Sequence, residues 1–253
     1  MTTPMPAPPA AVPAREIGGI AVAAASHDEA LALMLAAVER EAPAIFTFCN
    51  AHTVNLARSS VPLRKALRHA TVFNDGIGMD IASKLLFGAP FPDNLNGTDL
   101  TPALLGALPE GIAVYLLGSP AGVAQDAQAV LAARFPTLRF AGAEHGWFAE
   151  ADEPAIVERI RQSGAQLLIV GMGQPRQELW AARHAAALGI VQLCVGAYLD
   201  FAADRFPRAP LWVRQARLEW AFRLAQEPTR LAHRYLVGNA KFLINVVLER
   251  GRR

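Results

Sequence analysis

The alternation of short apolar runs with longer amphipathic segments is the feature that most constrains how this chain can fold. Each run has the length of a strand and ends near a glycine or a polar residue, and a segment with helical periodicity follows. Strands that alternate with helices form βαβ units, which predicts an α/β fold with a mainly parallel sheet flanked by helices. The runs lie at residues 17–24, 44–49, 71–74, 113–117, 138–141, 167–170 and 190–195.

The pattern divides the chain into three predicted parts. Residues 1–14 are rich in proline and alanine, and we expect them to form a disordered leader. Residues 15–203 carry the alternating pattern and form the predicted α/β domain. Residues 204–253 carry helical patterns alone, at 210–226 and 229–250, and form a predicted helical appendage.

Positive charge is concentrated near the C-terminus. Residues 201–253 hold 11 Lys and Arg against 4 Asp and Glu, while the whole chain has a formal net charge of only +2. Such asymmetry indicates either a partner that carries negative charge, such as phosphate or an anionic membrane, or a solvated helical surface.

Composition also limits the compartment and the cofactors. No apolar stretch is long enough to span a membrane, and the N-terminal residues lack the basic start and apolar core of a signal peptide. We therefore expect a cytoplasmic protein in which Cys49 and Cys194 are buried free thiols. The histidines and cysteines show no metal-ligand spacing and no D-x-D pair occurs, so we expect no metal cofactor.

Candidate site residues follow the predicted strands directly. In a parallel sheet, ligands bind beyond the carboxyl ends of the strands, so these residues should lie along one edge and form one site. The candidates are Asn50, Asp75, Gly118, Gly171, Gly173, Gln177, Glu178, Gly196 and Asp200.

Asp75 is the candidate catalytic residue. It lies in the segment Asn74-Asp-Gly-Ile-Gly directly after a predicted strand, where a carboxylate can take a proton from a bound hydroxyl group. The neighbouring glycines allow a substrate to approach the backbone closely. The alternative interpretation is that Asp75 caps the helix that follows.

The segment Gly171-Met-Gly-Gln-Pro-Arg-Gln-Glu is the strongest candidate for ligand binding. Amide groups at a helix start can hold a phosphate or the polar edge of a ligand. Its adjacent amide and carboxylate, Gln177 and Glu178, favour a binding role. The alternative is a tight strand-to-helix turn. The turn at Gly118 is a weaker nucleotide signal of the same kind.

The predicted appendage supplies candidate anion-binding arginines. Guanidinium groups bind diphosphate bidentately and keep their charge in proteins. Without a D-x-D pair to hold a cation, arginines or helix dipoles would have to neutralise a diphosphate leaving group. The candidates are Arg208, Arg223, Arg230 and Arg234, of which the last three are spaced so that a helical path can place them on one face.

These motifs together resemble the WecG/TagA/CpsF family of bacterial glycosyltransferases, from residue 17 to at least residue 235. Two positions depart from the family pattern, because Phe48 stands where many relatives have threonine and Asp204 where relatives often have glycine. The motifs are Asn50-Ala-His, Asn74-Asp-Gly-Ile-Gly, Asn96-Gly-Thr-Asp-Leu, Tyr115-Leu-Leu-Gly-Ser-Pro, His145-Gly-Trp-Phe, Gly171-Met-Gly-Gln-Pro-Arg-Gln-Glu, Val195-Gly-Ala-Tyr-Leu-Asp, Arg208-Ala-Pro and Leu218-Glu-Trp-Ala-Phe-Arg-Leu.

The resemblance implies a Rossmann-like fold with a C-terminal appendage. It implies inverting transfer of a sugar from a UDP-sugar to a saccharide on a polyprenyl diphosphate, in the synthesis of bacterial cell-surface polysaccharides. It implies that Asp75 is the general base and that the appendage completes the site near the membrane. The expected localisation is cytoplasmic and peripheral, at the inner face of the plasma membrane. A homo-oligomer is one expected oligomeric state.

A candidate for membrane contact lies near the C-terminus. Residues 242–248 are apolar and are flanked by Lys241 and Arg250. They predict either an amphipathic helix on a membrane surface or a face that packs on the domain or on another subunit.

Two other functions stay open on the sequence. A nicotinamide-dependent oxidoreductase could use the same fold, but the first strand-to-helix turn lacks G-x-G-x-x-G. A non-catalytic module could bind lipid, nucleotide or nucleic acid through the basic tail, but this leaves Asp75 and Gln177-Glu178 unexplained, and we expect no nucleic-acid partner.

Overall fold

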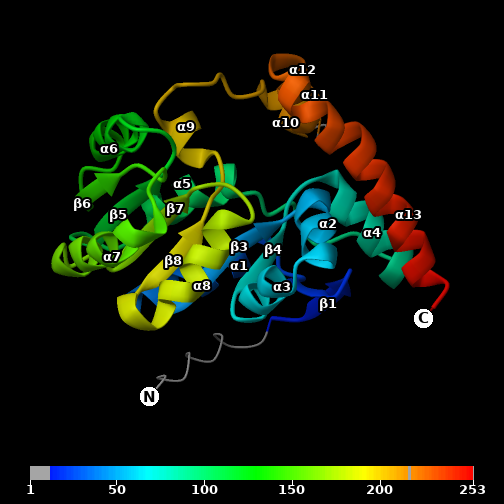
Figure 1. Cartoon of the computed structure of the whole chain (residues 1–253), viewed down its shortest axis with the longest axis horizontal. Helices are drawn as coiled ribbons and strands as arrows, with labels where there is room; N and C mark the ends of the chain where they lie inside the picture. The colour runs from blue at the N-terminus through cyan, green and yellow to red at the C-terminus, as the bar shows by residue number, and fades with distance from the viewer. Residues whose placement is uncertain (1–11, 216–217, 253) are drawn as a thin grey trace.

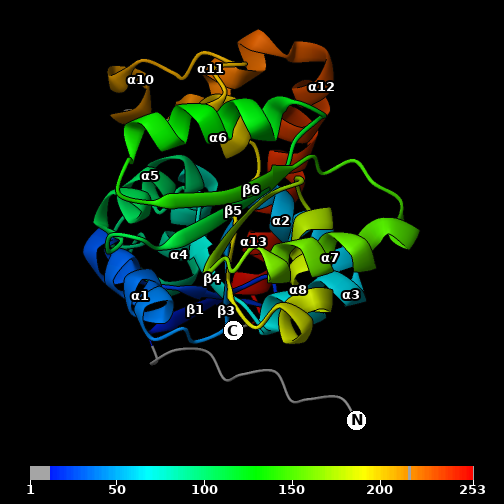
Figure 2. The same ribbon diagram turned by 90° about the vertical axis from the view of Figure 1, so that its left-hand side faces the viewer.

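The computed structural model describes residues 12–215 and 218–252 and shows a mainly parallel sheet between two layers of helices (Figures 1 and 2). The strand order is β1-β2-β4-β3-β8-β7-β5-β6, with β1 antiparallel to β2 and the other pairs parallel. The predicted α/β fold is confirmed. The strands are β1 Ala14–Ile17, β2 Ile20–Ala23, β3 Ala44–Cys49, β4 Thr71–Asn74, β5 Ala113–Gly118, β6 Arg139–Glu144, β7 Leu167–Gly171 and β8 Val191–Cys194.

Helices follow most strands, and the first of them begins at a capping signal in the sequence. Ser26 accepts from the Glu29 backbone amide, and the Glu29 carboxylate accepts from the Ser26 amide, which forms a capping box at the start of α1. The helices are α1 His27–Glu39, α2 Ala51–Ser59, α3 Val61–Arg68, α4 Ile77–Phe87, α5 Gly97–Ala107, α6 Val123–Arg134, α7 Glu153–Gln162, α8 Arg176–Leu188, α9 Tyr198–Ala202, α10 Leu211–Gln215, α11 Glu219–Gln226, α12 Pro228–Ala232 and α13 Gly238–Arg250, with a 3-10 turn at Glu150–Asp152 and a π-helical turn at His233–Val237.

Both faces of the sheet are buried, which explains why the central strands are almost continuously apolar. On one face, alternate strand residues such as Phe46 and Leu193 pack against α1, α5, α6 and α9. On the other, residues such as Val72 and Val170 pack against α2, α3, α7 and α8. Figure 2 shows α1 and α5 on one side of the strands and α3, α7 and α8 on the other.

The prediction of one strand over residues 17–24 is wrong. The chain forms a hairpin there, with β1 ending at Ile17 and β2 beginning at Ile20. Gly18 and Gly19 reverse the direction with φ of 61° and 79°. These values favour glycine, and a Cβ atom on Gly18 would lie 2.4 Å from the Val54 side chain.

The start of the described chain belongs to the fold. Val12 packs against the core, and Ala14 opens β1. Residues 1–11, which make up most of the predicted leader, lie outside the described residues. Cys49 and Cys194 are free and buried, as predicted, and burial raises the pKa of both thiols.

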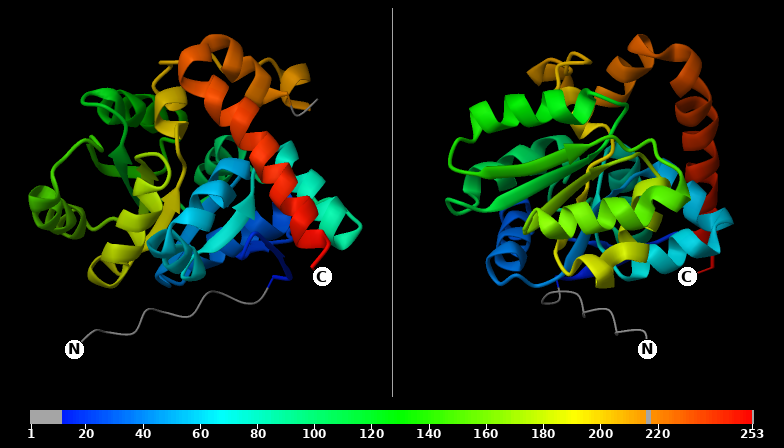
Figure 3. Two further views of the ribbon diagram at one scale, coloured as in Figure 1. Left: turned by 45° about the vertical axis from the view of Figure 1, so that its right-hand side comes forward. Right: turned by 60° about the vertical axis from the view of Figure 1, so that its left-hand side comes forward.

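The C-terminal region differs in part from its prediction. The single helix expected over residues 210–226 is replaced by α10 and α11, with 216–217 outside the described ranges. The helix expected over 229–250 is present as α12, the π-helical turn and α13 in direct succession. Figure 3 shows this last stretch running from above the carboxyl edge of the sheet down to the C-terminus at the opposite end.

One face of α13 is part of the protein core. Phe242 and Val246 are 1% and 0% exposed and share a cluster with residues of α2 and α4. On the outer face, Ile244, Val247 and Leu248 are more than half exposed. The inner face of α13 therefore packs on the domain, which was one of the two alternatives for this segment. The outer face is apolar and exposed. The predicted boundary at residues 203 and 204 stays a prediction.

No helix within the described ranges combines the length and the apolar character that a membrane crossing requires.

Candidate active site at the carboxyl edge of the sheet

Asp75 and Asn50 lie side by side because β3 and β4 are in register. Cys49 pairs with Asn74, so the next residue of each strand reaches the same point on the edge. The Asp75 amide donates to the Cys49 carbonyl oxygen at 2.8 Å, and Asn50 Nδ2 donates to Asp75 Oδ2 at 3.3 Å. The N-cap of α4 is Gly76 and no side chain caps that helix, so the helix-cap interpretation of Asp75 is wrong.

The carboxyl group of Asp75 is partly buried among charged groups of the C-terminal region. Burial raises its pKa, while the hydrogen bond from Asn50 and the positive charges of Arg234 and Arg223 act in the opposite direction. Burial also lowers the pKa of His52 to about 4, and the charge of Arg234 contributes. His52 is therefore neutral at pH 7.

A polar network links Asn50 to the turn after β7. Asn50 Oδ1 caps α2 by accepting from the His52 and Thr53 amides at 3.1 and 3.2 Å. Thr53 Oγ1 donates to Gln174 Oε1 at 2.9 Å, and Gln174 Nε2 donates to the Phe48 carbonyl oxygen at 2.8 Å. Gln174 was not among the predicted site residues, and its position inside a glycine-rich turn was the signal available.

Gln177 and Glu178 turn inward, which corrects the prediction that they bind substrate directly. Their exposures are 1% and 2%. Gln177 Oε1 accepts from the amides of Gly173 and Gly196 at 3.2 and 3.0 Å. Glu178 Oε1 accepts from Gln177 Nε2 and Thr47 Oγ1, and burial raises the pKa of this carboxyl group. The Gln177 side chain thus holds the two turns together, and Glu178 holds Gln177 in place.

Two glycines of the edge are required by close packing between turns. A Cβ atom on Gly118 would lie 2.4 Å from the Gly171 carbonyl oxygen, and one on Gly171 would lie 3.0 Å from the Gly196 oxygen and from Leu199. The tight-turn alternative therefore explains Gly118 and Gly171. Gly173 and Gly196 have φ of 77° and 60° with open space where a Cβ would stand, so their backbone conformation favours glycine.

Asp200 connects two of the edge turns. Ser119 Oγ donates to Asp200 Oδ2 at 3.0 Å, which links the β5–α6 turn to the short helix α9. Asp200 is partly buried and lies on the same edge as predicted.

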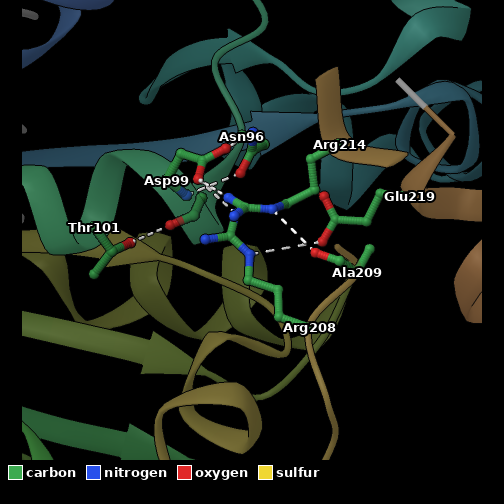
Figure 4. Close-up of polar contacts among 8 residues, drawn as sticks. Asn96, Asp99, Thr101, Arg208, Ala209, Arg214 and Glu219 are labelled. Atoms are coloured by element: carbon green, nitrogen blue, oxygen red, sulfur yellow. Dashed lines mark hydrogen bonds and ion pairs between the residues drawn. The ribbon is translucent and has the colours of Figure 1, made fainter. Parts of the chain in front are cut away.

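Arg208 is bound by two carboxylates of the protein (Figure 4). Its Nη2 atom donates to Asp99 Oδ1 at 2.5 Å, and its Nε atom lies 3.9 Å from Glu219 Oε1. Arg214 Nη1 donates to the same Asp99 oxygen at 3.4 Å. Asp99, which the sequence motifs included without a role, is therefore the centre of a charged cluster.

The other predicted arginines come from α11, α12 and the π-helical turn. Arg223 lies over the Phe201 ring at 5.4 Å, and Arg234 lies over the Tyr235 ring at 5.7 Å. The positive charges of both residues act to lower the pKa of Asp75, as described above. Arg230 belongs to α12, and its side chain lies outside the described part of the chain.

An exposed tryptophan at the same edge was also missed by the sequence prediction. Trp147 is 74% exposed in the loop after β6. The loop is anchored because the Gly146 amide donates to the Ser119 carbonyl oxygen at 2.9 Å and Arg176 donates to the Phe148 carbonyl oxygen at 2.9 Å. An indole ring on an anchored loop offers a flat surface to a base or a sugar.

In the part of the chain that the structure describes, no group of three His, Cys, Asp or Glu side chains is placed to hold a metal ion. Independence from metal stays a prediction.

Comparison with known families agrees with the motifs. The model of the glycosyl transferase WecG/TagA/CpsF family matches residues 15–253, nearly the whole chain. This family works in the synthesis of cell-surface polysaccharides. The match includes the segment with Asp75 and the C-terminal arginines that act on it. The chain therefore belongs to the WecG/TagA/CpsF family and is a glycosyltransferase.

Proposed function

We propose that this protein transfers a sugar from a UDP-sugar to a saccharide on a polyprenyl diphosphate, with inversion at the anomeric carbon. The observation that carries the proposal is the position of Asp75, a partly buried carboxyl group at the carboxyl edge on which the charges of Arg223 and Arg234 act. A base beside cationic groups suits attack by a hydroxyl and departure of a diphosphate.

Asp75 acts as the general base of the proposed reaction. Its carboxylate takes the proton of the acceptor hydroxyl while the oxygen forms a bond to the anomeric carbon. The bond from that carbon to the UDP oxygen breaks on the opposite face, and UDP leaves. Asn50, which donates to Asp75 Oδ2, orients the carboxylate for this step. The raised pKa favours base catalysis near neutral pH, because a stronger base accepts the proton more readily.

The donor subsite of the proposal is formed by the turns of the edge. The turns that contain Gly173 and Gly196 line the pocket, with Gln177 and Glu178 fixing them from below. Trp147 offers its ring to the uracil or to the sugar. The charge that develops on departing UDP is stabilised by C-terminal arginines, of which Arg223 and Arg234 already lower the pKa of Asp75 by their charge.

The acceptor enters from a membrane surface in this proposal. Ile244, Val247 and Leu248 form an exposed apolar face on α13, and Lys241 and Arg250 flank it. Such a face suits peripheral binding to an anionic bilayer at the inner side of the plasma membrane.

The proposal is tested by thermal unfolding of the purified protein with UDP, with NAD as the comparison. A ligand at one hundred times its dissociation constant stabilises the folded state by about 2.7 kcal/mol, which raises the unfolding temperature measurably. We expect a rise with UDP and none with NAD. A rise with NAD alone would contradict the proposal.

The pH dependence of kcat/KM tests the pairing of Asn50 with Asp75. The variant Asn50→Ser keeps an oxygen that can cap α2 but removes the amide that donates to Asp75. That donor lowers the pKa of Asp75, so its loss raises the pKa further. The base is then ionised only at higher pH, and the acidic limb of the profile should move to higher pH. If the acidic limb kept its position in Asn50→Ser, either Asp75 would not be the base or its hydrogen bond with Asn50 would have no part in the mechanism.

A further inference from the structure

The segment 204–241 is here named the bridge, and its residues within the described ranges cross above the carboxyl edge with few ties to the core. Both ends are anchored, since Leu199 before the bridge and Phe242 after it are core residues. Within the described part of the bridge, no residue belongs to the three core clusters, although Ala209, Val213 and Leu231 are buried. Its position over the site must therefore depend strongly on polar contacts.

Asp99 accepts from two arginines of the described bridge, while Arg205 of the bridge pairs with Asp126 of α6. Arg208 comes from the loop before α10, and Arg214 comes from α10 itself. Both donate to Asp99 Oδ1, at 2.5 and 3.4 Å. Figure 4 shows the two guanidinium groups converging on this carboxylate, with Glu219 of α11 on the other side of Arg208.

Asp99 is itself held firmly on the body. Asn96 caps α5 by accepting from the Asp99 amide at 2.9 Å, and its Nδ2 atom donates to Asp99 Oδ2 at 2.7 Å. Gly97 lies against Phe48, so closely that a Cβ atom would be 2.9 Å from the Phe48 ring. The phenylalanine that departs from the family pattern therefore supports the start of α5, and through it the position of Asp99.

The charges of the cluster stabilise the contact of Arg208 and Arg214 with Asp99. Burial alone would raise the pKa of Asp99, but hydrogen bonds from Asn96 and Arg208 and the charges of Arg208 and Arg214 hold it below its ordinary value. Asp99 is thus ionised over the physiological range. Arg208 lies between this carboxylate and the carboxyl group of Glu219, so a diphosphate would have to compete with groups of the protein for it.

We propose that Asp99 is a positioning residue that holds the bridge over the active site through Arg208 and Arg214. The kinetic part of the inference rests on the proposed function: contact with the diphosphate then falls to Arg223 and Arg234, which the bridge carries on α11 and the π-helical turn. Arg208 acts on the protein and not on the substrate.

Hydrogen exchange tests the positioning role without any assumption about the reaction. Asp99→Asn keeps the size of the side chain but removes its charge, and we expect amides of the bridge to exchange about tenfold faster while amides of β3, β5 and β7 exchange as before. Glu158→Gln removes the carboxylate of the exposed Arg161 pair on α7 and should change nothing in the bridge. Unchanged exchange in the bridge of Asp99→Asn, or faster exchange spread evenly over the whole protein, would overturn the inference.

A double-mutant cycle separates Arg208 from the substrate. If Arg208 serves only Asp99, the double variant of Asp99→Asn and Arg208→Gln should raise the donor KM no more than Asp99→Asn alone, about five- to tenfold, with a smaller effect on kcat. Arg208→Gln alone should raise it less, because Arg214 still donates to Asp99. Asp99→Glu should recover part of the loss because it restores the charge. Losses that multiply in the double variant would assign Arg208 to the substrate and overturn the inference. A wild-type protein without activity on UDP-sugars would count against the proposed function, and the exchange result would still decide the positioning role.

Discussion

Asp75→Asn should lower kcat by about 10²- to 10⁴-fold, the usual contribution of a general base, while UDP binding stays nearly the same. Asparagine has the same shape but cannot take a proton from the acceptor hydroxyl. The binding groups of the proposed donor subsite are unchanged in this variant. The measurement is single-turnover transfer at saturating donor, together with a calorimetric titration of UDP.

The control for this variant is Asp28→Asn, which makes the same chemical change at a side chain that is fully exposed on α1. It should leave both kcat and UDP binding unchanged. If Asp75→Asn turned over at the wild-type rate, Asp75 would not be the base. If instead its UDP affinity fell as far as its rate, Asp75 would act in binding and not in proton transfer.

Phe242→Ala should lower the free energy of unfolding by about 3–5 kcal/mol, the usual cost of removing a buried aromatic side chain. Phe242 is 1% exposed, and its ring lies near Gly78 and in a cluster with Met79 and Val54. The last helix is on this view part of the core that supports the Asp75 segment. Urea unfolding followed by circular dichroism gives the free energy directly.

Ile244→Ala is the matched control on the same helix. Its side chain is 61% exposed, so its removal should change the free energy of unfolding by less than about 0.5 kcal/mol. Equal effects of the two substitutions would contradict the assignment of inner and outer faces to α13. Ile244→Ala should weaken binding to anionic vesicles more than Phe242→Ala does, because Ile244 belongs to the proposed membrane face.

Much of the fold was predictable because apolar runs and helix signals act locally. The predicted runs at 44–49 and 71–74 match β3 and β4 at both ends. The hairpin at Gly18 was missed because β1 contains Arg15 and Glu16 and does not form an apolar run, although the Gly-Gly pair is a known hairpin signal. No glycine or proline lies within residues 211–226 to mark the break at Leu218 before α11.

The candidate site was predictable in its location and only partly in its roles. The register of parallel strands brings Asn50 to Asp75, and the rule for strand ends is enough to predict that. The sequence does not show how α8 is rotated about its axis, and this rotation decides whether Gln177 and Glu178 face a ligand or the interior. The prediction that they bind substrate directly therefore missed their burial. Asp99 was missed because its partners lie 109 and 115 residues away in sequence.

The most direct test of the account is acceptor-dependent release of UDP. The wild-type protein is incubated with a set of UDP-sugars, with and without a saccharide on a polyprenyl diphosphate, and free UDP is measured. The account predicts that at least one UDP-sugar gives release that requires the acceptor and that Asp75→Asn reduces by at least about 10²-fold. Acceptor-dependent transfer from a sugar on a different nucleotide alone, or release that Asp75→Asn supports at the wild-type rate, would contradict it.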